Sequence, residues 1–196
     1  MKKIFIDAEE LLLDSYRLGV RIYEHGFKPN FIIGLWRGGA PVGIAVQDCL
    51  EYLGVMTDHI SVRTSYLGMS SYAQMIENKG GIRVHGLQYL FDNLNSNDAL
   101  LIVDDVYSTG LSVKAVIDRL SKKTRRNMPK DIRIAAPWYK PSKNRSDREP
   151  DFYLHETDKW LVLPYELDGL SLDEIKTHKP NVMEMIDDIV QSLPAT

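Results

Sequence analysis

The segment 101–112 joins an apolar run to side chains that can bind anions. Leu101-Ile102-Val103 leads into two adjacent acids, Asp104 and Asp105, and then into a turn of small residues. The turn and the helix start after it comprise Val106, Tyr107, Ser108, Thr109, Gly110, Leu111 and Ser112. Backbone N–H groups at a helix N-terminus can cradle a phosphate, and the hydroxyl groups of the turn supply further donors.

The two acids narrow the ligand that this turn would bind. Carboxylates gain nothing from phosphate alone, but they accept hydrogen bonds from hydroxyl groups and they bind Mg²⁺. A sugar phosphate, with or without Mg²⁺, therefore fits both parts of the segment. No Gly-Lys-Ser/Thr sequence follows the turn, which excludes a Walker-type loop. The competing interpretation is a plain helix N-terminus with two capping acids.

Apolar runs typical of buried strands alternate with helical periodicity through most of the chain. The expected strands span 31–35, 60–64, 99–103, 132–136 and 160–163. The expected helices run from Asp7 to Gly26 and over 41–53, 111–120 and 181–193. This alternation predicts a parallel sheet, in which ligands bind at the carboxyl ends of the strands. The stretch 65–81 lacks clean periodicity and is interpreted as a long mobile excursion.

Composition limits the classes of protein that the chain can be. Its 196 residues, 44% of them hydrophobic, suffice for one domain with a sizeable core and exclude a disordered chain. One cysteine, Cys49, excludes an internal disulfide framework and favours a reducing compartment. No apolar run reaches transmembrane length, and the N-terminal run is too short for a signal peptide. We therefore expect a cytoplasmic protein.

The formal net charge of −3 hides an asymmetry. Residues 119–148 hold 11 of the 24 lysines and arginines but only two acids, which gives this stretch +9 and the remainder −12. Such a basic region in an acidic protein indicates an anionic ligand or partner, or simply a solvated face and a basic loop. The overall acidity and the lack of a nucleic-acid-binding motif argue against nucleic acid as the partner.

The segment 103–110 resembles the phosphoribosyl-pyrophosphate signature of the type I phosphoribosyltransferases. Three further segments agree in chain order, so the resemblance covers roughly residues 31–168. It implies a three-layer α/β fold with a parallel sheet, flanking helices and a small hood subdomain. It also implies a single domain over 1–196, with a core at about 28–140, a hood from the N-terminal segment and about 141–180, and a terminal helix at 181–196.

The segment 33–41 resembles the pyrophosphate loop of the same family, at Trp36, Arg37, Gly38 and Gly39. Glycines let the backbone approach the ligand, and Arg37 supplies positive charge. The family often has a cis peptide bond here, which would fall at Trp36-Arg37. The resemblance assigns phosphoribosyl pyrophosphate to this loop and to residues 104–112. The catalytic residues that it implies are Arg37, Asp104, Asp105 and Ser108.

Residues 135–140 and 158–168 resemble the base-recognition end of the 6-oxopurine members. Lys140 matches a lysine that donates to the exocyclic oxygen and N7, and Trp160 an aromatic residue that stacks on the purine. Leu161 matches a residue whose backbone reads the edge of the ring.

Two further matches concern the metal and a loop. Asp168 matches, with looser spacing, a carboxylate that holds a second Mg²⁺, so the implied metal ligands are Asp104, Asp105 and Asp168. Ser65 and Tyr66 match the Ser-Tyr pair of a flexible loop that folds over the bound substrate.

Ser108 departs from the 6-oxopurine pattern, which commonly has an aspartate there to manage the N7 proton of the purine. A serine hydroxyl is a poor base near neutral pH without an activating partner. The departure leaves three outcomes open: another group or water handles N7, the base needs less help, or the chain binds without catalysis.

The resemblance implies Mg²⁺-dependent transfer of a phosphoribosyl group from phosphoribosyl pyrophosphate to hypoxanthine, guanine or xanthine, as in purine salvage. The products are a nucleoside monophosphate and pyrophosphate. A homodimer or homotetramer without a membrane partner is expected. The alternatives are a transferase for another base, and a non-catalytic regulatory protein that senses phosphoribosyl pyrophosphate.

Overall fold

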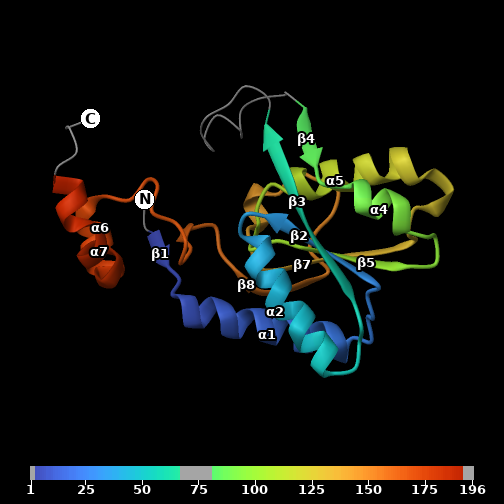
Figure 1. The fold of residues 1–196 in the computed structure, drawn as a ribbon, viewed down its shortest axis with the longest axis horizontal. Helices are drawn as coiled ribbons and strands as arrows, with labels where there is room; N and C mark the ends of the chain where they lie inside the picture. Colours follow the sequence, from blue (N-terminus) through green and yellow to red (C-terminus); the bar gives the residue numbers. More distant parts are fainter. Residues whose placement is uncertain (1–2, 67–80, 192–196) are drawn as a thin grey trace. The chain divides into compact units, whose positions relative to one another are not determined.

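The computed structural model describes residues 3–66 and 81–191 and divides into two compact units. The larger unit is Glu9–Asp158, and the smaller combines Met1–Ala8 with Lys159–Thr196. Each is described by itself below, and Figure 1 labels their elements.

The larger unit is built on a seven-stranded sheet in the order β4-β3-β2-β5-β7-β6, with β8 paired to β7. Its strands are β2 (Phe31–Trp36), β3 (Asp58–Tyr66), β4 (Ile82–His85), β5 (Ala99–Val103), β6 (Val106–Tyr107), β7 (Asp131–Tyr139) and β8 (Phe152–Glu156). Every pair is parallel except β3 with β4, which is antiparallel. The mostly parallel sheet confirms the predicted fold class.

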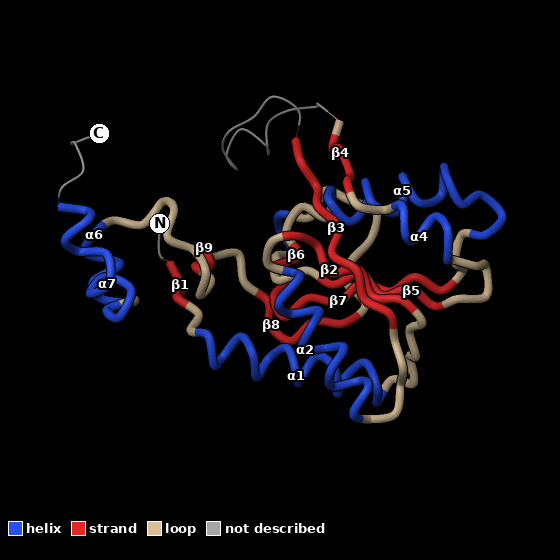
Figure 2. Tube along the Cα trace, in the orientation of Figure 1, coloured by secondary structure: helices blue, strands red, loops and turns tan. Residues whose placement is uncertain are grey.

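Helices cover both faces of the sheet, as Figure 2 shows. They are α1 (Ala8–Glu24), α2 (Gly39–Tyr52), α4 (Gln88–Asn93) and α5 (Leu111–Thr124). Along β5, Leu100 and Ile102 belong to the core cluster that includes α4 and α5, whereas Leu101 is buried outside that cluster. Alternating side chains of the strand are therefore buried on both faces, which is the pattern of a parallel sheet in three layers.

α1 is fastened to β8 through a buried acid. The side chain of Asp14 is only 1% exposed, and its carboxylate accepts a hydrogen bond from Arg17 Nη1 at 2.7 Å. The second carboxylate oxygen lies 2.7 Å from Nε2 of His155 on β8. An acid is rarely buried without such partners, because desolvation of the charge must be offset.

The predicted elements of the larger unit are confirmed with small shifts in their ends. The helix expected at 41–53 begins at Gly39, and the one expected at 111–120 continues to Thr124. Neither α4, β4 nor β8 was expected. Most of the excursion predicted at 65–81 lies outside the described residues.

The smaller unit pairs two short parallel strands, β1 (Lys3–Phe5) and β9 (Trp160–Val162), and adds α6 (Leu172–His178) and α7 (Pro180–Gln191). The strand expected at 160–163 pairs with β1 and not with the main sheet. Lys3 Nζ binds Glu174 Oε2 of α6 at 2.8 Å. Among the described residues, no helix is long and apolar enough to cross a membrane.

Candidate active site

Three loops of the larger unit lie at the carboxyl ends of neighbouring parallel strands. They follow β2 at Trp36–Gly39, β5 at 104–112 and β7 at Lys140. The register pairs Gly34 of β2 with Val103 of β5, and Val103 with Ala135 of β7. β2 ends two residues past this level and β7 four residues past it. Since all three strands are parallel, the first two predicted motifs and Lys140 follow the carboxyl ends of neighbouring strands.

Gly39 fixes the contact between the pyrophosphate loop and the acid pair. A β-carbon at this position would overlap the carbonyl oxygen of Val103 and lie 2.9 Å from the Cα atom of Asp104. Only glycine allows the two backbones to approach this closely. The Trp36-Arg37 peptide bond is cis, as expected. Both Trp36 and Arg37 are exposed, with Trp36 at 55%.

Asp104 and Asp105 form a pair of adjacent carboxylates. Asp104 Oδ1 accepts the backbone N–H of Asp105 at 3.0 Å, and Asp105 Oδ1 accepts that of Val106 at 2.8 Å. The carboxyl group of Asp104 lies deep among protein atoms, although part of the residue reaches solvent. Burial, and then the charge of Asp105, raise the pKa of Asp104 well above its ordinary value. A cation or hydroxyl donor at this position would relieve that cost.

The predicted phosphate turn runs into the N-terminus of α5. Gly110 caps the helix in the left-handed conformation, with φ of 71°, and no side chain of its own caps the first turn. The N–H of Leu111 has only a long bond to Thr109 Oγ1, at 3.4 Å. Ser108 and Thr109 are half-buried. Backbone donors and the positive end of the helix dipole therefore converge where a phosphate was predicted.

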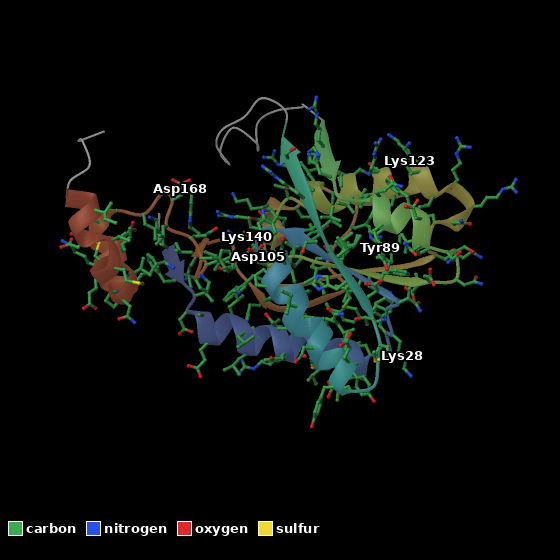
Figure 3. All side chains as sticks on the ribbon, in the orientation of Figure 1. Lys28, Tyr89, Asp105, Lys123, Lys140 and Asp168 are labelled. Atoms are coloured by element: carbon green, nitrogen blue, oxygen red, sulfur yellow. The ribbon has the colours of Figure 1, made fainter. Side chains whose placement is uncertain are left out.

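Lys140 lies beside this turn because β6 pairs with the end of β7. The N–H of Lys140 donates to the carbonyl oxygen of Tyr107 at 2.9 Å, and Tyr107 itself pairs with Tyr139. Figure 3 labels Asp105 and Lys140 at the same edge of the sheet. The structure thus brings Lys140 next to the predicted phosphate turn, although the two are more than 25 residues apart in the sequence.

The other predicted base-binding and metal residues belong to the smaller unit. Trp160 is 47% exposed at the start of β9, and Leu161 is buried and pairs with Ile4. Asp168 is exposed. Lys179 donates to the carbonyl oxygens of Leu163 at 3.1 Å and Pro164 at 2.7 Å, and burial lowers the pKa of its ammonium group.

The predicted flexible-loop residues end the strand β3. Ser65 pairs with Arg83, and Ser65 Oγ lies 3.0 Å from His85 Nε2. Only the backbone of Tyr66 is described, and residues 67–80 of the predicted loop lie outside the described residues.

Sequence reasoning missed one part of the site. The loop 144–148 contacts the phosphate turn: the N–H of Arg145 donates to the carbonyl oxygen of Thr109 at 3.0 Å. Tyr107 Oη donates to the carbonyl oxygen of Arg148 at 3.0 Å. The spacing of Asn144 and Ser146, typical of a side chain that bonds the backbone two residues on, was the available signal. Within 3–66 and 81–191, no three potential ligands form a ready-made metal cluster.

The fold is a mostly parallel sheet with helices on both faces, and its candidate site lies at the carboxyl ends of the strands. The model of the phosphoribosyl transferase domain matches residues 4–169, and the chain belongs to this family. The predicted type I family is thereby confirmed, and the chain is classed as a phosphoribosyltransferase enzyme. No curated protein sequence matches the chain at a significant level.

Solved structures with the same fold are distant in sequence. A purine phosphoribosyltransferase from Pyrococcus horikoshii Ot3 is 24% identical, with a TM-score of 0.62 over 87% of this chain and 99% of that one. A hypothetical protein from Neisseria gonorrhoeae with bound ppGpp is 18% identical, with a TM-score of 0.67 over 92% and 97%. The Helicobacter pylori xanthine-guanine-hypoxanthine phosphoribosyltransferase is 17% identical, with a TM-score of 0.62 over 90% and 100%.

Proposed function

We propose that the protein transfers the phosphoribosyl group of phosphoribosyl pyrophosphate to a 6-oxopurine base, releasing pyrophosphate. The observation that carries the proposal is the close approach of Gly39 to Val103 and Asp104, which only a missing side chain permits. It brings a loop suited to pyrophosphate against an acid pair suited to ribose hydroxyls. The phosphate turn continues from the same acids along the chain. One substrate, phosphoribosyl pyrophosphate, carries all three groups.

The residues act mainly by positioning and by charge. The phosphate turn binds the 5′-phosphate, and Asp104 and Asp105 accept hydrogen bonds from the ribose hydroxyls. Arg37 and the backbone of Gly38 and Gly39 stabilise charge on the leaving pyrophosphate. The bond from C1′ to pyrophosphate breaks as a purine nitrogen bonds to C1′, and the proton of the purine N–H passes to water or to the released pyrophosphate. Positive charge therefore develops on the ribose during the step, where the carboxylates stabilise it.

The acid pair also fits Mg²⁺. Mg²⁺ binds through one or two carboxylates together with substrate phosphates and water, and it needs no complete protein cage. Burial, and then the charge of Asp105, raise the pKa of Asp104, and a divalent cation would stabilise such a pair of adjacent carboxylates. When bound, the ion would neutralise the charge of the pyrophosphate. Asp168 is a further proposed ligand on the strength of the resemblance alone.

The choice of a 6-oxopurine rests on the base-recognition residues. Lys140 would donate to the exocyclic oxygen and N7, Trp160 would stack on the ring, and the backbone of Leu161 would read its edge. The Pyrococcus and Helicobacter neighbours, named for purine and for xanthine, guanine and hypoxanthine, support this choice. Closure of a loop at Ser65 and Tyr66, a single functional domain, a cytoplasmic location and a homo-oligomer remain predictions of the same resemblance.

A screen for pyrophosphate release tests the proposal. Hypoxanthine, guanine, xanthine, adenine, uracil and orotate are each incubated with phosphoribosyl pyrophosphate, with and without Mg²⁺. We expect release with a 6-oxopurine and Mg²⁺, loss of release in Asp105→Asn, and wild-type rates in Asp48→Asn, an exposed acid on α2. Pyrophosphate release with orotate or uracil, and with none of the purines, would contradict the choice of a 6-oxopurine and assign the transfer to another base.

Ser108 favours a second candidate, a regulatory protein that binds phosphoribosyl pyrophosphate without catalysis. Calorimetry separates the two functions: tight binding of phosphoribosyl pyrophosphate with no pyrophosphate release from any base would establish the second. Ser108→Asp serves as a probe in the same screen. A large gain in the rate with purines would show that the wild-type serine is tuned to a different base or role.

A further inference from the structure

The loop 144–148 is hydrogen-bonded to the phosphate turn at residues on both sides of Ser108. Tyr107, the last residue of β6, is 1% exposed, and its hydroxyl group lies 2.9 Å from Ser146 Oγ. The same hydroxyl donates to the carbonyl oxygen of Arg148 at 3.0 Å. A second link, from the N–H of Arg145 to the carbonyl oxygen of Thr109 at 3.0 Å, fastens the middle of the turn. The loop therefore contacts the turn on both sides of Ser108.

The loop is itself shaped by two short polar side chains. Asn144 Oδ1 accepts the N–H of Ser146 at 3.0 Å, and Asn144 Nδ2 donates to the carbonyl oxygen of Arg148 at 2.8 Å. Ser146 Oγ lies 2.9 Å from Asn144 Oδ1 and 2.8 Å from the carbonyl oxygen of Arg148. One hydroxyl proton cannot serve every neighbour, so these distances describe a shared network centred on Ser146.

Gly110 connects this network to the helix N-terminus. Its φ of 71° sets the direction of the backbone N–H groups that begin α5. A β-carbon on Gly110 would overlap Ser146 Oγ and lie 2.5 Å from Tyr107 Oη. The network thus packs against the residue that sets the direction of the backbone donors. The lining of a cavity of ≈ 120 Å³ beside it includes Tyr107, Gly110, Ser146 and Arg148. With open space at its flank, the turn depends on these hydrogen bonds for its shape.

We infer that Ser146, together with Asn144, is a positioning residue that holds the phosphate turn in the conformation that binds the 5′-phosphate. Neither side chain touches the substrate; both act through Tyr107 and Gly110. The inference rests on the proposed function for its ligand, but the shape of the free turn is a property of the protein alone. Its consequence is selective: affinity for the 5′-phosphate depends on Ser146, and affinity for pyrophosphate, bound by the loop at Arg37, does not.

Calorimetry with three probes tests this selectivity. Ribose 5-phosphate, pyrophosphate and phosphoribosyl pyrophosphate are titrated in the presence of Mg²⁺ into the wild type, Ser146→Ala and Ser142→Ala. Ser142 is an exposed serine of the same chain segment and serves as the matched control. We expect Ser146→Ala to weaken both ribose phosphates about 5- to 10-fold, the effect of one or two lost hydrogen bonds, and to leave pyrophosphate unchanged. Equal affinities in both variants, or an equal loss for all three probes, would overturn the inference.

Hydrogen exchange separates this inference from the proposed function. In the ligand-free protein, the amides of residues 108–112 should exchange several-fold faster in Ser146→Ala than in Ser142→Ala. Asn144→Ala should give the same pattern, and the double variant should add little to either single one because both act on one network. Unaltered exchange in both variants would refute the positioning role. A wild type that binds no phosphoribosyl pyrophosphate, with the exchange effect intact, would refute only the proposed function.

Discussion

Replacing Asp104 with asparagine should stabilise the free protein and abolish its reaction. The substitution keeps the size of the side chain and an oxygen that can accept the N–H of Asp105, which donates to Asp104 Oδ1 at 3.0 Å. It removes a carboxylate group whose pKa is raised by burial and by the charge of Asp105. The same change removes the negative charge and one of the two carboxylate oxygens that the proposed ribose and Mg²⁺ site uses, so stability and activity should move in opposite directions.

The sign follows from the direction of the pKa shift. A carboxyl group whose pKa is higher in the folded than in the unfolded state costs stability once the pH passes its unfolded value. Because part of Asp104 reaches solvent, screening reduces the cost. We expect Asp104→Asn to gain stability at pH 7 within the range of single stabilising substitutions, about 0.5–2 kcal/mol, or about 1–8 °C in Tm for a chain of this length.

Thermal melts at pH values from 3 to 8 check this reasoning. The advantage of Asp104→Asn should be absent below roughly pH 4, where both side chains are neutral, and should grow as the pH rises. Asp105→Asn should give a smaller gain, because it removes only the second cause of the shift. Two results would refute the account of a costly buried carboxylate: a Tm advantage that does not change with pH, or an Asp104→Asn variant that folds but is less stable than the wild type.

Three further substitutions test the rest of the structure. Gly39→Ala should abolish pyrophosphate release and lower the free energy of unfolding by roughly 2 kcal/mol or more, because the added β-carbon overlaps the main chain of β5. The control Gly81→Ala, whose β-carbon meets nothing within 4 Å, should match the wild type in urea unfolding. Asp14→Ala should lose roughly 2–4 kcal/mol by leaving His155 without its buried acceptor, and Asp14→Asn should recover part of that loss. Lys140→Met should raise the KM for a 6-oxopurine about tenfold with little change for phosphoribosyl pyrophosphate, and an unchanged KM would contradict its assigned role.

The strand ends could be predicted because they depend on local information. Ile102 and its neighbours form a continuous apolar run, since both faces of the strand are buried, and the run stops at Asp104. The turn that follows is encoded by Gly110, whose left-handed conformation few other residues adopt. The cis bond at Trp36-Arg37 was expected from the family resemblance and from nothing local to the chain.

The partners of strands and loops could not be predicted in the same way. The apolar run at 160–163 predicts a strand, but its sequence does not reveal that the strand pairs with residues 3–5 rather than with the main sheet. The contacts of Ser146 likewise join residues about 40 positions apart, and its neighbours in the sequence are those of an ordinary polar loop. Such pairings depend on long-range packing rather than on local propensity.

The basic stretch 119–148 shows how a charge pattern can combine several causes. Lys122 and Lys123 lie in the last turn of α5, where a cation interacts favourably with the helix dipole. Arg133 and Arg148 both form ion pairs with Asp151, which lies just beyond the stretch. These four positions have structural explanations, and among the other cations of the stretch Lys140 lies beside the proposed phosphate turn.

The proposed active site also shows why stability alone does not explain its sequence. Asparagine at position 104 would avoid a buried charge. The acid that is present has a raised pKa because it is buried and lies beside a second acid, Asp105. Gly39 and Gly110 give the unfolded chain extra conformational freedom that folding must remove, although the close approach at Gly39 and the positive φ of Gly110 require glycine. Each of these choices has a free-energy cost, and each lies at the same edge of the sheet. A ligand with a phosphate, hydroxyl groups and an associated cation offsets all three costs at once, which a plain helix N-terminus with capping acids would not.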